Sequence, residues 1–340
     1  MANPTTAPAG FRPSYETCAE VSALCPVQLT TLGYYPNQGV NLFLAIGFAL
    51  AAVTTIFFGV WKRTWGYSIA VAAGCILECA GYIGRFQLGK NPWNGNAFKT
   101  QIVSIVLGPT LICIGLYLTL KHVVAAINPS LSRVPPRVYP LFFVPADFSC
   151  LVIQAIGGGI AAAAGRDKYS LLQHGNRVII AGIVLQVVVL GVFGALSGLY
   201  LVQARRWIKS DTTGERGSLW YDGRFRLFLY AMMGAYAALL IRCIYRIAEM
   251  AGGWGNHIMQ DEPSFVVLES FMVLIASVLL AAFAPGFFFP QMSHHPEIKH
   301  SRHPAPSVGA DGATKPPAQT DSEETGNEMV EKSAPVPIQA

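Results

Sequence analysis

The sequence predicts an all-α polytopic membrane protein, a bundle of seven transmembrane helices, from its composition and its apolar runs. Of 340 residues, 52% are hydrophobic and 13% are charged, whereas a soluble domain has about 25% charged residues. The mean hydropathy is +0.42. A helix needs roughly 20 apolar residues to cross the hydrocarbon, and seven runs meet this need. They lie at about 39–61, 65–86, 98–120, 141–163, 178–202, 226–248 and 265–289.

Each run is interpreted as a helix because a backbone in lipid must satisfy its own hydrogen bonds. The chain then divides into an extracellular N-terminal segment (1–38), a seven-helix transmembrane domain (39–290) and a tail (291–340). The tail is rich in Pro, Ser, Thr, Gly and acidic residues, with too few large apolar side chains to fold. We expect it to be disordered in the cytosol and open to cytosolic partners.

Lysine and arginine are distributed unequally between the two sides of the predicted bundle. One side carries twelve of them, namely Lys62, Arg63, Lys121, Arg133, Arg137, Arg205, Arg206, Lys209, Arg216, Arg224, Lys299 and Arg302. The other carries six, namely Arg12, Lys90, Lys99, Arg166, Lys168 and Arg177. Cytoplasmic loops carry the excess, so the N-terminus is expected outside and the C-terminus inside. Spread over short loops, these residues do not indicate nucleic-acid binding.

Two of the seven cysteines precede the first span. Cys18 and Cys25 lie in the segment expected outside, where oxidation is permitted. A local disulfide and two free thiols both remain open. The other five cysteines lie within spans and are expected to act as small apolar side chains.

Polar and charged side chains occur inside the spans, although a charge at the bilayer centre costs roughly 2.5–3.5 kcal/mol. In the second span, Glu78, Tyr82 and Arg85 follow one another at spacings of four and three, so they share one helical face. The full set of candidate site residues from this pattern is Glu78, Tyr82, Arg85, Asp147, Gln154, Gln186, Arg242, Arg246, Glu249, Glu262 and Glu269.

Most of these groups converge on one half of the bundle. With the expected orientation and a rise of 1.5 Å per residue, Glu78, Arg242 and Glu269 lie about 6–12 Å below the outer ends of their spans. Gln186 lies at a similar depth, and Asp147 is the exception, near the cytosolic end of the fourth span. The sequence therefore predicts a polar cluster in the outer half.

The three arginines of this cluster need compensation. We expect Arg85, Arg242 and Arg246 each to have a carboxylate within about 4 Å, supplied by Glu78, Glu249 or Glu269. Such pairs either only hold the helices together or line a binding or translocation site. Interhelical polar contacts contribute little stability in membranes, which favours the second alternative.

Several other chemistries are excluded by absence from the sequence. There is no G-x-x-x-x-G-K-[ST] loop for ATP. No lysine lies in the interior of a span for a retinal Schiff base, and no histidine lies inside a span for a zinc hydrolase. We therefore expect neither enzymatic activity nor a cofactor nor a metal. The small-residue stretch QAIGGGIAAAAG (154–165) is expected to permit close helix packing.

Three segments together resemble a known family. LECAGYIGRF in the second span, DFSCLVIQAIGGG in the fourth, and IRCIYRIAEMAGGWGNHIMQDEPSFVVLE across the sixth and seventh resemble the motifs of the fungal lipid-translocating exporters. This family is named for aminocholesterol resistance and includes sphingoid long-chain base transporters. The resemblance implies seven spans, an outside N-terminus and amphiphilic lipids or lipid-like toxins as substrates. The residues it marks are Glu78, Gly81, Tyr82, Arg85, Asp147, Gln154, Arg242, Tyr245, Arg246, Glu249, Glu262 and Glu269.

Two functions remain open. The first is a translocator that exports amphiphiles, expected in the plasma membrane among membrane lipids. The second is a seven-span sensor that signals through its cytosolic loops.

The charge count within the spans suggests the cargo. Glu78, Asp147, Glu249 and Glu269 oppose only three arginines, which leaves one carboxylate for a cationic or hydroxylated head such as that of a sphingoid base. A phosphate head would suit the arginines instead, and a protonated Asp147 would remove the imbalance.

Overall fold

The computed structural model describes residues 13–15, 17–164, 169–210, 220, 222–253 and 255–285. Within these residues the regular secondary structure is helical, and they contain no strand. Seven of their helices are long and apolar enough to cross a membrane, which confirms the predicted fold class. The predicted tail (291–340) lies outside the described residues.

The seven spans coincide with the predicted runs but are mostly longer. They are α1 (Gln38–Lys62), α2 (Trp65–Lys90), α3 (Gly95–Ile127), α4 (Val138–Ala164), α5 (Tyr169–Lys209), α7 (Gly223–Ala251) and a composite seventh span. The seventh span consists of α8 (Glu262–Ser264), the π-helix η4 (Phe265–Phe271) and α9 (Met272–Ala282). Short 3₁₀ turns, η1 (Val27–Leu29) and η2 (Pro129–Leu131), lie in the connections.

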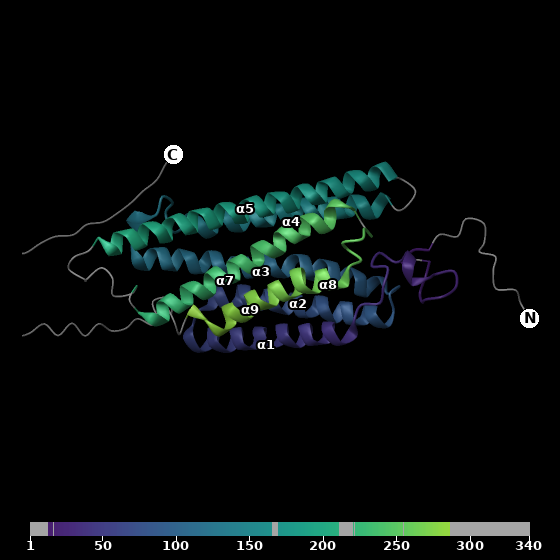
Figure 1. Ribbon diagram of the computed structural model, residues 1–340, viewed down its shortest axis with the longest axis horizontal. Helices are drawn as coiled ribbons and strands as arrows, with labels where there is room; N and C mark the ends of the chain where they lie inside the picture. Colours follow the sequence, from purple (N-terminus) through teal and green to yellow (C-terminus); the bar gives the residue numbers. More distant parts are fainter. Residues whose placement is uncertain are drawn as a thin grey trace, which may run out of the picture. The chain divides into compact units, whose positions relative to one another are not determined.

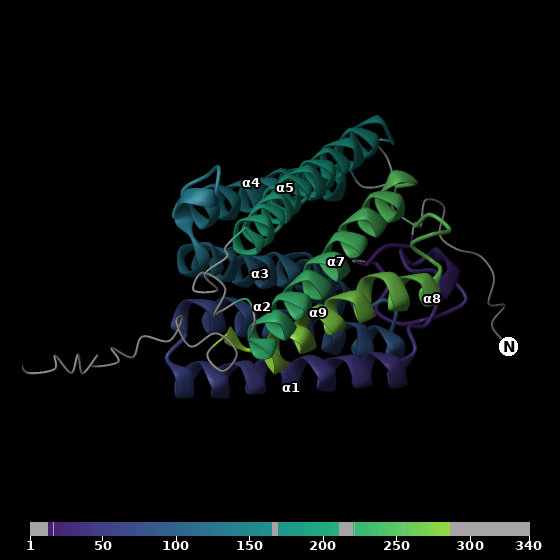
Figure 2. The same ribbon diagram turned by 60° about the vertical axis from the view of Figure 1, so that its left-hand side comes forward.

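Consecutive helices pack as neighbours, α1 on α2, α2 on α3 and α4 on α5, while α9 packs on α7 and α1. Figures 1 and 2 show α4 and α5 side by side along one flank, α1 along the opposite flank, and α7 crossing between them. The beginnings of α1, α3 and α8 and the ends of α2 and α7 share one end of the bundle (Figure 1). We call it the disulfide end, after the disulfide described below.

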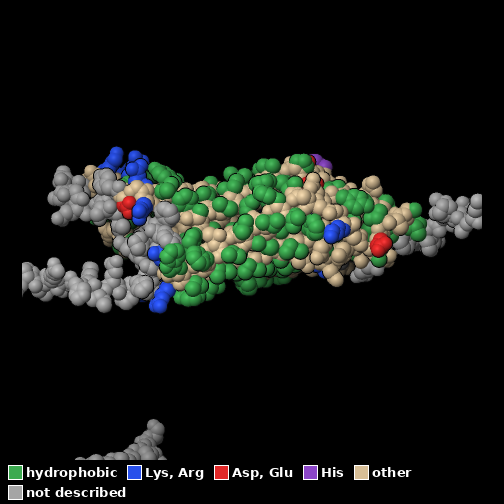
Figure 3. All heavy atoms as spheres, turned by 90° about the horizontal axis from the view of Figure 1, so that it is seen from below, with side chains coloured by type: hydrophobic (Ala, Val, Ile, Leu, Met, Phe, Trp, Pro, Cys, Tyr) green, Lys and Arg blue, Asp and Glu red, His purple; other side chains and the backbone are tan. Residues whose placement is uncertain are grey.

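The outer surface of the bundle is apolar along most of its length. Large hydrophobic side chains such as Leu50, Phe57 and Leu141 are exposed. Figure 3 shows a broad band of hydrophobic side chains, with lysine and arginine gathered mainly at the end opposite the disulfide end. A band of this kind is the surface that a bilayer would cover.

Asparagine caps fix where two of the spans begin. Asn37 Oδ1 accepts hydrogen bonds from the backbone N–H groups of Gly39 and Val40, and Asn94 Oδ1 accepts one from Ala97. An N-cap of this type satisfies donors that the first turn of a helix leaves unpaired. Both caps lie at the disulfide end.

The backbones of α4 and α5 touch where the glycine stretch lies. A Cβ added at Gly157 would lie 2.7 Å from the backbone nitrogen of Ile179 and 2.9 Å from the carbonyl oxygen of Gly175. At Gly158 and Gly159, no described atom lies within 4 Å of an added Cβ. The close-packing interpretation of residues 154–165 is therefore confirmed, and Gly157 is the residue of the glycine triplet that permits the contact.

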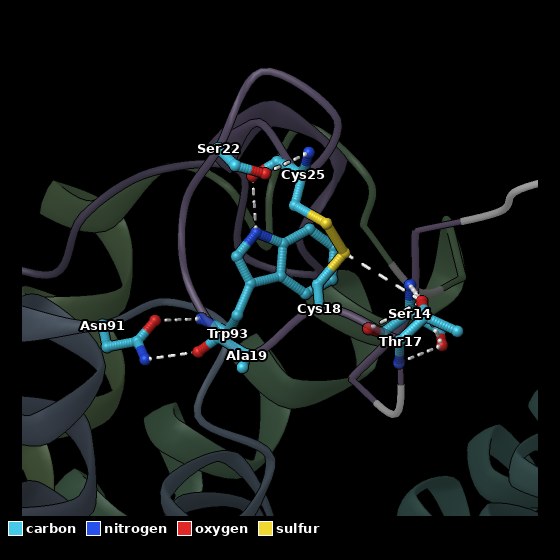
Figure 4. The surroundings of a disulfide bond; sticks show 8 residues. All are labelled: Ser14, Thr17, Cys18, Ala19, Ser22, Cys25, Asn91 and Trp93. Carbon is cyan, nitrogen blue, oxygen red and sulfur yellow. Dashed lines mark hydrogen bonds between the residues drawn. A yellow bond between two sulfur atoms is a disulfide. The ribbon is translucent and has the colours of Figure 1, made fainter. Parts of the chain in front are cut away.

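The N-terminal segment is held to the disulfide end by a disulfide between Cys18 and Cys25. This confirms one of the two alternatives left open above. The disulfide packs on Trp93, whose Nε1 donates to the Cys25 carbonyl at 2.9 Å (Figure 4). Asn91 Nδ2 also donates to the Ala19 carbonyl, at 2.7 Å. The loop between α2 and α3 therefore anchors the segment that precedes α1.

Candidate functional site

A buried ion pair joins α7 to the seventh span. Arg242 Nη2 lies 2.7 Å from Glu269 Oε1, and Arg242 Nε donates to the same oxygen at 3.0 Å. Only 3% of Arg242 and 0% of Glu269 are exposed. With Glu78 and Tyr82, which lie beside this pair, we call these residues the buried cluster.

A proline in α3 leaves free the carbonyl that is the second partner of Arg242. Proline has no N–H, so Pro109 cannot donate to the carbonyl four residues earlier, that of Ile105. Arg242 Nη2 donates to this Ile105 carbonyl at 2.9 Å. The break in the α3 hydrogen-bond ladder therefore becomes part of the arginine site.

The π-helix η4 presents an inner face to the buried cluster. Phe265, Glu269 and Ser270 are all buried, and Ser270 Oγ donates to the Phe265 carbonyl five residues earlier, at 3.5 Å. A wider turn of this kind is rare and occurs frequently at functional sites. It gives the seventh span adjacent inward-facing residues that an ordinary helical turn would separate.

Glu78 is the unpaired member of the buried cluster. Its side chain is 0% exposed, and no group in the described part of the chain donates a hydrogen bond to either carboxyl oxygen. Gly108 leaves room for it, because a Cβ there would lie 2.6 Å from Glu78 Oε1. The neighbouring Tyr82 stacks on Phe48 with ring centroids 5.4 Å apart, and no described residue accepts from its hydroxyl.

A pocket opens beside this cluster, nearer the disulfide end. Its cavity volume is about 40 Å³. Its lining is Leu32, Arg85, Phe98, Gln101, Ile102, Ile105, Val106, Arg246, Glu249, Met250, Met259 and Phe265. We call it the Arg85 pocket; four of its residues are polar or charged and the rest are apolar.

Arg85 is held in this pocket without a carboxylate. Its Nη2 donates to the Tyr34 hydroxyl, and its guanidinium carbon lies 4.0 Å from the centroid of the Phe265 ring, in a cation–π contact. Burial raises the pKa of the Tyr34 phenol above its usual value, so this hydroxyl stays neutral beside the arginine. The N-terminal segment thus contributes a side chain to the wall of the pocket.

The other charged residues of the Arg85 pocket form a pair on α7. Arg246 Nη1 lies 2.5 Å from Glu249 Oε2. On α3, Gln101 is 5% exposed, and no described donor reaches its Oε1. The pocket therefore offers two kinds of hydrogen-bond acceptor, a carboxylate and an unpaired amide oxygen.

A second, smaller pocket lies on the other side of Arg246. Its cavity volume is about 10 Å³, and its lining is Val106, Gln154, Ile183, Gln186, Arg242, Cys243 and Arg246. Gln154 Nε2 donates to Gln186 Oε1 at 3.1 Å, and Gln186 Nε2 donates to Thr110 Oγ1 at 3.3 Å. We call it the Gln186 pocket. Val106 and Arg246 line both pockets, so the two pockets are neighbours.

The predicted arginine pairing is confirmed for Arg242 and Arg246 and is wrong for Arg85. No carboxylate of the described residues forms an ion pair with Arg85. Glu78 lies seven residues away on the same helix, about 10 Å along its axis, and cannot reach it. The Tyr34 hydroxyl and the Phe265 ring occupy the space around the guanidinium instead.

Three predicted site residues lie apart from these contacts. Asp147 Oδ2 accepts from the Tyr117 hydroxyl at 2.6 Å, between α4 and α3. Glu262 accepts from the backbone N–H of Asn37 at 2.7 Å and so caps α1 rather than joining the cluster. Tyr245 is buried on α7, and no described residue accepts from its hydroxyl.

Sequence reasoning missed several residues that build the site. Gln101 and Thr110 were detectable, since polar side chains in an apolar span are themselves a signal. Tyr34 and Phe265 gave no such signal. Tyr34 lies in a loop, and Phe265 is one apolar residue among many in its predicted span. Among the described residues, no group of three or more His, Cys, Asp or Glu side chains is placed to hold a metal ion.

The whole arrangement falls within a known family. Residues 71–292 match the profile of a family described as RTA1 like protein, a range that contains all twelve predicted site residues. The chain belongs to the RTA1-like family. This confirms the predicted resemblance to the fungal lipid-translocating exporters.

Individual RTA1-like relatives come from baker's yeast. The chain is 28% identical over 283 residues to the sphingoid long-chain base transporter RSB1 of Saccharomyces cerevisiae strain EC1118, covering 76% of this chain and 74% of the relative. It is 29% identical over 222 residues to protoporphyrin uptake protein 1 (64% and 67%). It is 27% identical over 232 residues to protein RTM1 (67% and 69%). No solved structure matches.

The apolar spans and these relatives together support a multi-pass membrane transporter of the RTA1-like family. Two of the relatives are named for a cargo, which is sphingoid long-chain base in one and protoporphyrin in the other. The pockets of this chain are the features that bear on its own cargo.

Proposed function

We propose that this RTA1-like protein exports single-chain amphiphiles of the sphingoid long-chain base type across the plasma membrane. The observation that carries the proposal is the Arg85 pocket, whose polar residues face an otherwise apolar lining. The relative named as a sphingoid long-chain base transporter supports the cargo class. Export would remove a toxic amphiphile and confer resistance to it.

The two ends of such a cargo match the two parts of the lining. An amine and hydroxyl head donates hydrogen bonds, and Gln101 Oε1 and the Glu249 carboxylate accept them. Glu249 is shared with Arg246, so a cationic head would compete for a carboxylate that is already oriented. The tail would lie against Phe98, Met250 and neighbouring apolar residues, where the flexible methionine adapts to chains of different shape.

Purified protein in liposomes tests the cargo. Gln101→Leu removes the unpaired acceptor at nearly constant volume, and we expect it to slow movement of labelled long-chain base about threefold to tenfold, since one hydrogen bond contributes about 0.5–1.5 kcal/mol. Gln87→Leu, the same change at an exposed position on α2, is the matched control and should leave the rate unchanged.

The outcomes separate the alternatives. Wild-type protein that moves no more base than protein-free liposomes would reject translocation and favour the sensor function. Equal rates in Gln101→Leu and Gln87→Leu would reject the Arg85 pocket as the head-group site while leaving translocation intact.

The proposal includes an outward-facing disulfide end. Lysine and arginine gather mainly at the other end (Figure 3), as expected for the cytosolic side. The Cys18–Cys25 disulfide is of the kind that persists outside the reducing cytosol. Both observations agree with export from cytosol to medium.

The disulfide also offers a test of orientation. Intact cells treated with a membrane-impermeant reductant and then an impermeant maleimide should label Cys18 and Cys25. The Cys18→Ser/Cys25→Ser variant should show no labelling, because the remaining cysteines are in spans and four of these five are buried. Labelling of wild type only after lysis would reverse the orientation.

A further inference from the structure

The carboxyl group of Glu78 is enclosed on every side by protein. It is fully buried on α2, and its Oε1 lies against Gly108 so closely that an added Cβ would be at 2.6 Å. Ile105 of α3 links this region to the Arg85 pocket. This residue lines the pocket, packs on Gly81 of α2, and gives its carbonyl oxygen to Arg242.

The ion pairs of the bundle leave Glu78 without a cation of its own. Arg242 is bonded to Glu269, and Arg246 to Glu249. An ionised carboxylate in an apolar interior without donors is strongly disfavoured, and such a group takes up a proton instead. A neutral carboxyl group is therefore the form of Glu78 that this packing accommodates.

Few ionisable groups face Glu78, and they lie on α7, η4 and α2. Arg242 and Arg246 on α7 and Glu269 on η4 act on it electrostatically, and Tyr82 and Cys75 lie near it on its own helix. By sequence, α9 has no ionisable side chain and α1 has only Lys62 at its far end. On α3, Gly108 and Pro109 face the cluster. Release of a proton from Glu78 would thus place its carboxylate, in addition to that of Glu269, near Arg242.

The elements around Glu78 are those whose backbone can rearrange. Pro109 interrupts the hydrogen-bond ladder of α3 next to Gly108. The seventh span carries the π-helix η4 at Glu269, and conversion of a π turn to an ordinary turn would shift that carboxylate around the helix. A change in either element would alter the packing around Glu78 and the position of the carboxylate that Arg242 binds.

We propose that Glu78 is the proton-carrying group of the transport cycle and that export of one cationic amphiphile is exchanged for one inward-moving proton. The proposal rests on the translocation function proposed above. In each cycle the carboxylate takes one proton from the outer water, forming an O–H bond, and that bond breaks as the proton is released to the cytosol. Exchange of one cation for another leaves the charge of the bundle unchanged, so no bare charge crosses the hydrocarbon.

Liposomes with a pH gradient test the exchange. With labelled long-chain base inside and a trapped pH dye, wild-type protein should drive base outward as protons enter. One pH unit corresponds to a tenfold bias in the base ratio, because 1.36 kcal/mol is stored per unit. Glu78→Gln, which keeps the size but carries no exchangeable acid proton, should respond to the gradient only as much as protein-free liposomes do. The response of Glu78→Gln also corrects for passive redistribution of the amine.

Three outcomes would overturn the proposal. They are gradient-independent rates in wild type, an undiminished gradient response in Glu78→Gln, and loss of all movement at zero gradient in a folded Glu78→Gln protein. The last would assign Glu78 to head-group binding.

An infrared measurement separates this proposal from the proposed function. At neutral pH, the wild-type protein should show a carboxylic-acid carbonyl band that Glu78→Gln lacks and that Glu262→Gln, altered at a partly exposed cap, retains. Absence of the band in wild type would overturn the protonated Glu78 whatever the liposomes show. The band together with no movement of base would reject the cargo instead.

Discussion

Arg242→Gln is expected to destabilise the folded protein by about 3–5 kcal/mol, the usual cost of removing one partner from a buried ion pair. The change leaves Glu269 fully buried without its cation. It also removes the donor to the Ile105 carbonyl, which Pro109 has already deprived of its helical partner. Thermal unfolding of the purified protein in detergent, followed by intrinsic fluorescence, measures the loss.

The Arg242→Gln/Glu269→Gln double variant is the matched control. Replacing both charges removes the uncompensated carboxylate, so most of the lost stability should return. Arg246→Gln is a second comparison, since its partner Glu249 borders a pocket rather than the closed cluster. A double variant no more stable than Arg242→Gln alone would show that the stability comes from the arginine and the Ile105 carbonyl, not from the ion pair.

Gly157→Ala is expected to destabilise the protein by about 1–3 kcal/mol, the typical cost of overpacking. The new methyl group would meet the backbones of Ile179 and Gly175 at 2.7–2.9 Å, and backbone atoms cannot move aside as a flexible side chain can. The α4–α5 pair would have to separate. The same unfolding measurement in detergent detects the change.

The neighbouring glycines provide controls at which alanine is expected to keep or raise the stability. Alanine at Gly158 or Gly159 meets no described atom within 4 Å. Because alanine favours a helix over glycine by about 1 kcal/mol, these variants should equal or exceed wild type in stability. Equal destabilisation at all three positions would mean that the triplet acts through helix flexibility and not through the crossing.

The spans were predictable because lipid imposes a length and a composition on each one. The residues at which the spans begin and end were harder to predict. The fifth run was predicted at about 178–202, whereas α5 extends from Tyr169 to Lys209. Hydropathy reports only the part of a helix in hydrocarbon, and a helix continues into water until a cap or a proline ends it. The predicted end of the seventh run, at about 289, lies outside the described residues.

The members of the buried cluster were predictable as a set, but their partners were not. Helical spacing shows which residues share a face and does not show which neighbouring helix they meet. Arg85 was expected to meet a carboxylate and meets Tyr34, a loop residue that spacing arguments cannot place. Glu262, seven residues before Glu269, was predicted as a site residue. The wider turn of η4 and the position of Pro263 instead leave Glu262 at the helix start, where it caps α1.

Gly108 and Pro109 illustrate a signal that was present and not used. Both residues break helices. Inside an apolar span, another group must donate to the carbonyl that proline leaves unpaired and must fill the space where glycine has no side chain. Arg242 and Glu78 do so. A Gly-Pro pair in a span thus indicates that polar residues of other helices will contact that span.

The hydrogen bond from Asn37 to Glu262 has a consequence for biosynthesis. Its two residues are separated by 225 positions, so the ribosome completes the seventh span roughly 10–45 s after the first, at ordinary rates of elongation. During that interval the start of α1 lacks a partner that the finished protein gives it. The start of α1 therefore acquires this hydrogen bond only after the last span of the bundle has been made.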